Sequence, residues 1–398
     1  MMFMRNAGLV LFWMAGCSAT LLPVWAQPSP PPSLANDQPR LIQVGPQRAL
    51  RSLAEAARQA RDGDTIEVDA GDYAGDVAVW TRDDLTIRGV GGRVRLLANG
   101  AVAEGKGIWV VRGGALLVEH LDFVGARVAE LNGAGIRFEK GRLTVRDCRF
   151  IDNENGILTG SDKNAELDIE DSEFGNNGAG DGYSHNLYVG AIGRLKVTGS
   201  YFHHARGGHL LKSRAAENVI FYNRLTDEPG GQASYELEFA NGGIAYVVGN
   251  LIEQGAQTQN PHLISYGAEG YRWPRNELYL AHNTLIDDRP AGGVFLRVAP
   301  GAGQVRLVNN LLLGAGRFEP AENAEAAGNL RLTAGDFVAP QRQDYRLRKS
   351  VRLAGKLAEA GTANGVSLVP TREYLHPRRT RPLEHAATLP GALQTTVP

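Results

Sequence analysis

The chain has 398 residues, in which 42 lysines and arginines are balanced by 43 aspartates and glutamates. This balance excludes the basic excess typical of nucleic-acid-binding proteins, so we expect no nucleic-acid partner. The 49 glycines, at average hydrophobicity, favour a β-rich architecture with many tight turns.

The N-terminal residues have the features of an export signal. Arg5 supplies a positive charge, Gly8 to Trp13 form a short apolar run, and Val24 to Ala26 fit a signal-peptidase site. We predict a signal peptide over residues 1–26 and export to the periplasm or the extracellular space. Because Pro23 interrupts the short apolar stretch, we expect no stable membrane span.

The region after the apolar run predicts an alternative lipidation site and a linker, and the cysteine count excludes a disulfide. The segment Met14-Ala15-Gly16-Cys17 resembles a lipoprotein cleavage box, so lipidation at Cys17 is an alternative to soluble export. Residues 27–40 are rich in proline and poor in apolar side chains, which predicts an extended linker. Signal cleavage leaves Cys148 as the single cysteine and therefore excludes an intrachain disulfide.

A repeated pattern runs through the middle of the chain: two alternating apolar residues, then a small residue or asparagine, then another apolar residue. Its copies follow one another every 23 to 33 residues between Leu121 and Asn310. Such self-similarity indicates stacked repeats, and the period-two alternation indicates strands instead of helices. A third apolar strand accompanies each copy, from Gly107-Ile108-Trp109-Val110 to Gly293-Val294-Phe295-Leu296.

The later copies carry an asparagine at one fixed position of the repeat. Asparagine tolerates left-handed backbone and its amide can bond to the next repeat, so we expect a ladder of stacked asparagines in a turn. In this respect the sequence resembles the pectate-lyase-like superfamily of right-handed parallel β-helices, over roughly residues 60–340. The resemblance implies an all-β solenoid with three strands per rung. The ladder residues are Asn223, Asn250, Asn283 and Asn310.

We assign residues 41–340 to this right-handed parallel β-helix, and its length and period predict about ten rungs. Apolar residues at helical spacing between Arg48 and Arg61 predict an N-terminal helix that caps the open end of the solenoid. Residues 341–398 are rich in arginine and proline, and we expect an irregular segment that packs along the β-helix. We expect the protein to be a monomer.

Reactive side chains gather on the third strand and its borders in four consecutive rungs. Neighbouring strands lie about 4.8 Å apart, so these side chains are expected to form one outer patch about 15 Å tall. We predict that this patch binds an acidic polysaccharide or oligosaccharide. The predicted catalytic residues are Lys212, Arg214, His209 and Tyr188. The predicted substrate-binding residues are His185, Asn186, Glu236, Glu238, His262 and Tyr266.

One string within this patch is similar to a known lyase family. His209-Leu210-Leu211-Lys212-Ser213-Arg214 resembles the family that contains chondroitinase B and alginate lyases, which carries a Lys-Ser pair on this strand. The resemblance implies that Lys212 matches the family's catalytic base. The family's Glu-x-Glu calcium pair has no counterpart, because residues 205–207 are Ala-Arg-Gly.

Lyases of this kind remove the proton at C5 of a uronic acid and expel the C4 substituent. A lysine flanked by arginine and histidine can have its pKa lowered by like charge, which would make Lys212 a usable base. Arg214 or His209 would neutralise the substrate carboxylate, and Tyr188 or Tyr266 would protonate the leaving oxygen. Elimination from a uronic acid-containing polysaccharide is therefore the predicted activity.

Other functions are compatible with the same residues. Glu236 and Glu238, two positions apart on a strand, are expected to share a face and could act as acid and base of a glycoside hydrolase or an epimerase. They could instead bind calcium together with Asn241, or form ion pairs with Lys212 and Arg214. A non-catalytic carbohydrate-binding or adhesion solenoid is a further alternative. Calcium is the only cofactor that these hypotheses invoke.

Overall fold

The computed structural model describes residues 38–319, 323–353 and 355–397 of the chain. The predicted signal peptide, the alternative lipidation site at Cys17 and most of the predicted linker lie outside the described residues. Among the described residues, no helix is long and apolar enough to cross a membrane.

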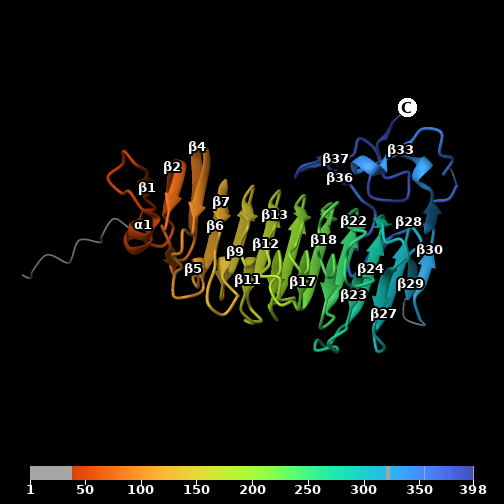
Figure 1. The fold of residues 1–398 in the computed structure, drawn as a ribbon, viewed down its shortest axis with the longest axis horizontal. Coiled ribbons are helices and arrows are strands. Elements are labelled where there is room, and N and C mark those ends of the chain that lie inside the picture. Colours follow the sequence, from red (N-terminus) through yellow and green to blue (C-terminus); the bar gives the residue numbers. More distant parts are fainter. Residues whose placement is uncertain (1–37, 320–322, 354, 398) are drawn as a thin grey trace, which may run out of the picture. The chain divides into compact units, whose positions relative to one another are not determined.

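The chain winds into a right-handed parallel β-helix in which a typical rung supplies two strands to one sheet and one strand to another (Figure 1). The large sheet has 21 strands and the small sheet has 10, one for each rung. The predicted all-β solenoid, with three strands per rung and about ten rungs, is confirmed.

The small sheet forms one wall of the solenoid. Its strands pair in parallel, each with its equivalent in the next rung. They are β3 (Ala78–Trp80), β5 (Gly107–Val111), β8 (Ala134–Phe138), β11 (Asn155–Thr159), β14 (Leu187–Val189), β17 (Leu211–Ser213), β20 (Leu237–Phe239), β23 (His262–Tyr266), β26 (Val294–Val298) and β29 (Arg317–Glu319).

The large sheet forms two walls, which we call its first and second arms. It opens with β1 (Leu41–Val44) and the long strands β2 (Thr65–Ala74) and β4 (Leu85–Leu97). The first arm continues with β6 (Ala115–Glu119), β9 (Arg142–Arg146), β12 (Glu166–Glu170), β15 (Arg194–Thr198), β18 (Glu217–Phe221), β21 (Ile244–Val248), β24 (Glu277–Ala281), β27 (Gln304–Val308) and β30 (Glu325–Ala327). The second arm continues with β7 (Leu121–Val124), β10 (Arg149–Ile151), β13 (Glu173–Gly175), β16 (Tyr201–His203), β19 (Arg224–Thr226), β22 (Leu251–Gln254), β25 (Thr284–Asp287), β28 (Leu311–Gly314) and β31 (Leu330–Leu332).

The predicted asparagine ladder joins the two arms. The Oδ1 atom of Asn250 accepts from the backbone N–H of Asn223 at 2.8 Å. In the next rung, Asn283 Oδ1 accepts from the backbone N–H of Asn250 at 2.9 Å. The left-handed residue is the one before each asparagine, such as Tyr222 (φ 57°) or His282 (φ 51°), and not the asparagine itself, which corrects the sequence prediction. The corner turns at that preceding residue, so the next side chain points inward and reaches the backbone of the neighbouring rung.

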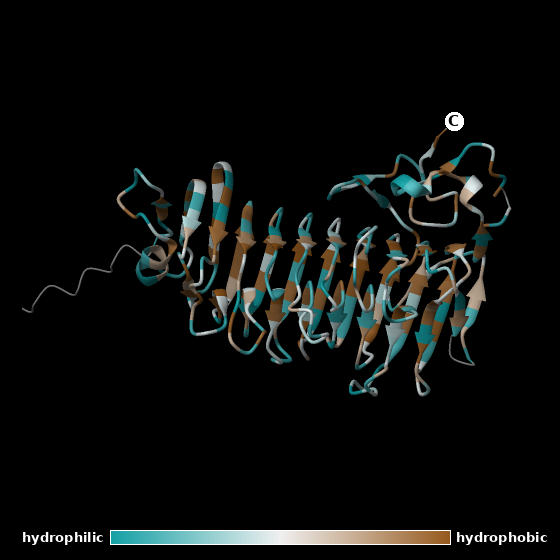
Figure 2. Cartoon of the chain, in the orientation of Figure 1, coloured by the Kyte–Doolittle hydropathy of each residue, from teal (hydrophilic) through white to brown (hydrophobic). Residues whose placement is uncertain are grey.

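Aromatic side chains stack inside the first half of the solenoid. Phe123, Phe150, Phe174 and Phe202 lie face to face in consecutive rungs, with ring centroids 4.7 to 5.0 Å apart. Figure 2 shows hydrophobic and hydrophilic residues alternating along the strands, as an inward and an outward face require. The predicted cap is the helix α1 (Leu53–Gln59), whose Leu53 is part of the core.

The C-terminal segment, described over residues 333–353 and 355–397, covers outer faces of the large sheet in its later rungs (Figure 1). Apolar side chains of this segment, including Phe337 and Tyr345, pack on Ile286 of the second arm, and Leu368 packs beside Tyr246 of the first arm. The segment contains η1 (Ala334–Asp336), β32 (Phe337–Ala339), η2 (Pro340–Arg342), β33 (Asp344–Arg348), β34 (Thr362–Ala363), β35 (Val366–Ser367), β36 (Arg372–Tyr374), β37 (Thr380–Pro382) and β38 (Thr396–Val397).

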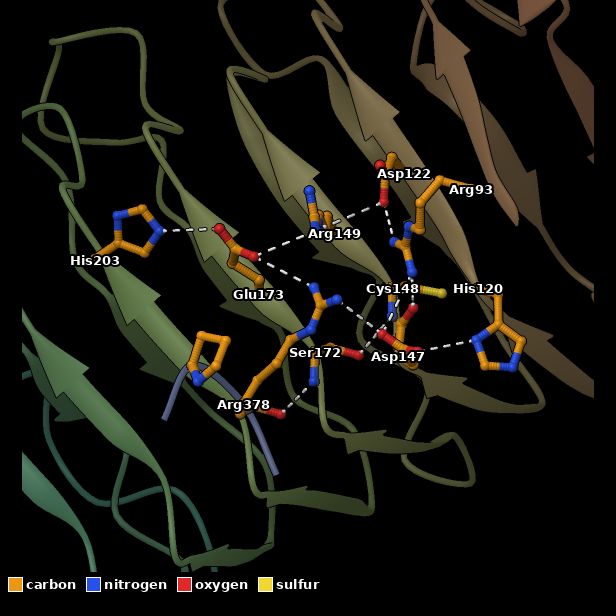
Figure 3. Close-up of polar contacts among 12 residues, drawn as sticks. Arg93, His120, Asp122, Asp147, Cys148, Arg149, Ser172, Glu173, His203 and Arg378 are labelled. Atoms are coloured by element: carbon orange, nitrogen blue, oxygen red, sulfur yellow. Dashed lines mark hydrogen bonds and ion pairs between the residues drawn. The ribbon is translucent and has the colours of Figure 1, made fainter. Parts of the chain in front are cut away.

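Ion pairs fix the same segment farther along the solenoid. Arg378 lies 3.0 Å from Asp147 and 3.3 Å from Glu173, which come from successive rungs (Figure 3). Asp147 also contacts Arg93 and His120, so its charge is shared within a network. Because these contacts all involve the large sheet, the outer face of the small sheet is the wall that the C-terminal segment leaves accessible.

A buried histidine links the C-terminal segment to the ladder corner. His282 is 1% exposed, and its Nδ1 lies 3.2 Å from the carbonyl oxygen of Leu389 while its Nε2 lies 3.0 Å from Asn309 Nδ2. The amide of Asn309 donates to Nε2, so the ring is neutral with its proton on Nδ1. Burial lowers the pKa of His282 to about 4.

We predict that acid loosens this junction. A histidine whose pKa is lowered in the folded state stabilises the protein above its ordinary pKa of 6.5, and that stabilisation is lost as the pH falls from 6.5 toward 4. His282→Gln should therefore flatten the fall of the thermal midpoint over this interval, while His385→Gln, at an exposed position, should leave the fall unchanged. Equal pH profiles for the wild type and His282→Gln would contradict the prediction.

Candidate functional site

The outer face of the small sheet carries a column of stacked polar side chains. Tyr188 of β14 pairs with Lys212 of β17, which pairs with Glu238 of β20, each directly beside the next. The continuation of the column is Ser265, while Leu158 precedes Tyr188. The structure thus brings together three of the predicted residues on one outer wall.

Lys212 is held by two carboxylates. Its Nζ lies 3.0 Å from Glu238 Oε2 and 2.8 Å from Oε1 of Glu269, a residue of the loop between β23 and β24. Burial alone would lower the pKa of Lys212, but the two carboxylates outweigh it and the pKa is raised. This corrects the prediction of a lysine made basic by like charge, because the nearest charges are negative.

Glu238 also contacts His209, which in turn bonds to His185. His209 Nε2 lies 3.0 Å from Glu238 Oε2, and the backbone N–H of His209 donates to His185 Nδ1 at 2.9 Å. Burial opposes ionisation of Glu238, yet the contacts with His209 and Lys212 lower its pKa to about 2. Burial lowers the pKa of both histidines, that of His185 to well below 6.5, so His185 is neutral.

Arg214 forms the other side of the site. Its guanidinium donates to the hydroxyl of Tyr188, lies 5.1 Å from the centroid of that ring, and contacts Glu269 Oε2 at 2.5 Å. The indole of Trp273 donates to the Arg214 carbonyl at 3.0 Å and fixes the backbone there. Glu269 therefore bridges the two cations Lys212 and Arg214.

Two residues that the sequence analysis did not select belong to this site. The ring of Tyr235 meets His209 edge-on at 4.8 Å between centroids and lies 6.1 Å from His262. Glu269 is the second. It belongs to the loop between β23 and β24, and the sequence repeat does not predict where this loop lies. His262 itself is half-buried at the edge of the wall, with Nδ1 2.6 Å from Asn260 Oδ1.

Three predicted substrate-binding residues lie inside the solenoid: Tyr266, Asn186 and Glu236. Tyr266 is fully buried in the core, and its hydroxyl donates to the carbonyl of Gly243. Asn186 is also fully buried and extends a second ladder, in which its Oδ1 accepts from Asn177 Nδ2 at 2.8 Å. None of these side chains is available to a substrate, which corrects all three predictions. Alternation already places Tyr266 on the same face as the core residue Ile264.

Glu236 and Glu238 do not share a face. Glu236 precedes the first residue of β20 and is fully buried in register with the core residues Leu210 and Leu263, because the chain bends at this corner. The glutamate pair proposed for hydrolysis or epimerisation is therefore separated by the wall of the solenoid. The same separation rules out the calcium site proposed for this pair with Asn241, because two carboxylates on opposite sides of the wall cannot bind one ion.

Among the described residues, no group of three or more histidine, cysteine, aspartate or glutamate side chains is arranged to hold a metal. A cavity of about 550 Å³ lies away from Lys212, between the C-terminal segment and the second arm. It is lined by residues such as Arg224, Tyr345 and Tyr374.

Comparison with solved structures identifies the fold. Pectate lyase Pel9A superposes with a TM-score of 0.59 at 13% identity, over 82% of this chain and 93% of that protein. The solenoid is a pectate-lyase-like right-handed β-helix. ORF18 of Geobacillus virus E2 gives a TM-score of 0.47 at 14% identity (70% and 55% coverage), and an alginate lyase from Paenibacillus sp. strain FPU-7 gives 0.44 at 16% (73% and 99%). No family model matches the sequence. No curated protein matches it either.

We predict that the ion-pair cluster contributes to stability through Glu238. Glu238→Gln leaves Lys212 and His209 without their buried anion, and removing one partner of a buried pair costs roughly 3 kcal/mol. Chemical denaturation should show this loss in the free energy of unfolding. Glu166→Gln removes a carboxylate from a more exposed pair with Arg142 and should cost less than about 0.5 kcal/mol. Similar losses for both variants would contradict the prediction.

Proposed function

We propose that the protein is a polysaccharide lyase that cleaves a uronic acid-containing polymer by β-elimination at the wall formed by Tyr188, Lys212 and Arg214. The observation that carries the proposal is the bridging carboxylate of Glu269, held at 2.8 Å by Lys212 and at 2.5 Å by Arg214. The Glu269 side chain is 39% exposed and belongs to a loop, so the carboxylate of a substrate can replace it.

The substrate carboxylate would then accept from Lys212 and Arg214, which neutralise it and make the C5 proton of the uronic acid acidic. Lys212 takes this role and not that of the base, because Glu238 remains beside it and keeps it charged. This changes the role that the resemblance to the chondroitinase B family implies for the lysine.

Tyr188 is the proton-transfer group in this proposal. In the reacting complex Tyr188 is a phenolate paired with the Arg214 guanidinium. Its oxygen takes the C5 proton, the electron pair of the C–H bond forms the C4–C5 double bond, and the C4–O bond breaks. The phenol then returns the proton to the leaving oxygen, so no other reactant is consumed. Arg214 donates to the Tyr188 oxygen and balances its charge during the transfer.

Two features of the chain support a polymeric substrate outside the cytoplasm. The small sheet continues for several rungs on either side of the site, which gives the wall the length that a chain of sugars requires. The export signal proposed for residues 1–26 would bring the protein to such polymers in the periplasm or the extracellular space.

The proposal predicts distinct effects of two lysine variants. Lys212→Met should reduce turnover by about 10²- to 10⁴-fold, as should Tyr188→Phe, whereas Lys212→Arg should keep a measurable fraction because it retains the charge. The assay follows absorbance of the unsaturated product at about 235 nm on a panel that includes polygalacturonate and alginate.

The control variant is Arg142→Met, which removes a cation from the first arm and should leave turnover unchanged. Two results together would show that Lys212 is the base after all: Lys212→Arg as inactive as Lys212→Met, and a wild-type turnover that rises steeply at high pH. Binding of a polymer without any unsaturated product would instead support a carbohydrate-binding solenoid.

Glu269 gives a second prediction, on affinity. Glu269→Ala removes the carboxylate that competes with the substrate, so the KM for an acidic oligosaccharide should fall several-fold while kcat changes little. Glu319→Ala, another partly exposed carboxylate at the edge of the small sheet, is the matched control. A large loss of kcat in Glu269→Ala would show that Glu269 takes part in the chemistry and would contradict the exchange.

A further inference from the structure

A second group of acidic and amide side chains lies inside the corner that joins the second arm to the small sheet. Asp227, Glu236 and Gln254 are all fully buried. Asp227 immediately follows β19, Gln254 ends β22, and Glu236 immediately precedes β20. This corner is distinct from the outer wall, because Glu236 and Glu238 lie on opposite faces of the small sheet.

The unpartnered polar atoms of these side chains are all oxygen acceptors. Asp227 Oδ1, both carboxyl oxygens of Glu236 and Gln254 Oε1 have no hydrogen-bond partner among the described residues. The other polar atoms are used locally: Asp227 Oδ2 accepts from Ala233 N at 2.8 Å, and Gln254 Nε2 donates to the Asn260 carbonyl. Four side-chain oxygens therefore remain without a hydrogen-bond partner among the described residues.

The oxygens converge because the rungs are stacked. Asp227 N donates to the Glu253 carbonyl, which places Asp227 beside Gln254, and Gln254 pairs with Asp287 in the following rung. Burial and the negative charge of Asp227 raise the pKa of Glu236 well above its ordinary value. Asp227 Oδ2 accepts from the backbone N–H of Ala233, three residues before Glu236, so the turn between β19 and β20 folds back onto Asp227.

Further oxygens border the same corner at Gly293. A Cβ atom at Gly293 would lie 2.7 Å from the carbonyl oxygen of Pro261, 2.9 Å from Gln254 Oε1 and 3.1 Å from Asp287 Oδ1. Three oxygens from three different segments therefore surround one small volume that only glycine leaves free. Backbone carbonyls are common ligands of hard cations, so this edge can complete an oxygen shell.

A buried carboxyl group without a hydrogen-bond donor is either protonated or compensated by a cation. We infer that Asp227, Glu236 and Gln254 bind a calcium ion inside this corner. Two carboxylates match the charge of a divalent ion, and a donor set made only of oxygen suits calcium and excludes the nitrogen and sulfur ligands that zinc prefers. Among the described residues no three acidic or histidine side chains are arranged to hold a metal, so the Gln254 amide and backbone carbonyls would supply the remaining ligands.

The ion would have a structural consequence for the neighbouring wall. Glu236 is adjacent in sequence to Tyr235, whose ring meets His209, and is two residues from Glu238. Calcium would tie the turn between β19 and β20 to β22 and so fix the start of β20.

The test uses the purified full-length chain after treatment with EDTA and dialysis. Titration with CaCl₂ in a calorimeter should show one site, and 1 mM CaCl₂ should raise the thermal midpoint by several degrees, because a ligand that binds only the folded state stabilises it. Glu236→Gln keeps the shape of the side chain and removes its charge. It should lose most of the shift, and its midpoint in EDTA should be at least that of the wild type.

The matched control is Glu154→Gln. Glu154 is also buried at a corner before a small-sheet strand, but it accepts from the backbone of Val128 and Gly133, so this variant should keep the full calcium response. A wild-type midpoint that does not respond to CaCl₂, an equal response in Glu236→Gln, or a response to MgCl₂ or KCl without one to CaCl₂ would overturn the proposal. These measurements need no substrate, so their outcome is independent of the proposed lyase activity.

Discussion

The in-register parallel stacking of rungs is the constraint on which the rest of the structure depends. Each strand pairs with its equivalent one rung away, so every side chain has a neighbour of the same position about 4.8 Å above and below it. A polar side chain that turns inward must therefore find its partner within its own column. The asparagine ladder meets this requirement. The side-chain oxygen of Asn250 accepts from the backbone and side-chain amides of Asn223, and its Nδ2 donates to the Ile220 carbonyl and to Asn283 Oδ1.

The same stacking produces the candidate site. Tyr188, Lys212 and Glu238 come from segments more than twenty residues apart in sequence, and adjacent rungs place them side by side without any long-range folding. Their charges are then balanced locally, because Lys212 and Arg214 face Glu238 and Glu269. A wall that is close to neutral does not attract an anion by net charge. Recognition of a uronate would depend on the exchange of one carboxylate for another between two fixed cations.

The C-terminal segment covers walls other than the one on which the candidate site lies. Its apolar side chains cover both arms of the large sheet, where outward residues such as Tyr246 and Ile286 are themselves apolar in the later rungs. The small sheet has no such cover from this segment, and its outer column is polar from Tyr188 onward. The acidic corner lies behind that column, so both sites belong to the same few rungs.

The amino-acid sequence by itself determined the solenoid, its rungs and the ladder, because period-two alternation and a fixed repeat act locally along straight strands. It also predicted one outer patch that included Tyr188, Lys212, Glu236 and Glu238, but the register that puts Tyr188, Lys212 and Glu238 in one column came from the structure. Alternation also placed Tyr266 inward, although the sequence analysis did not apply it there. Only the tertiary structure placed Glu236 in the core and brought Glu269 onto Lys212. The direction of the chain at a corner depends on contacts between rungs, and so does the path of a loop. A local sequence pattern does not predict these contacts.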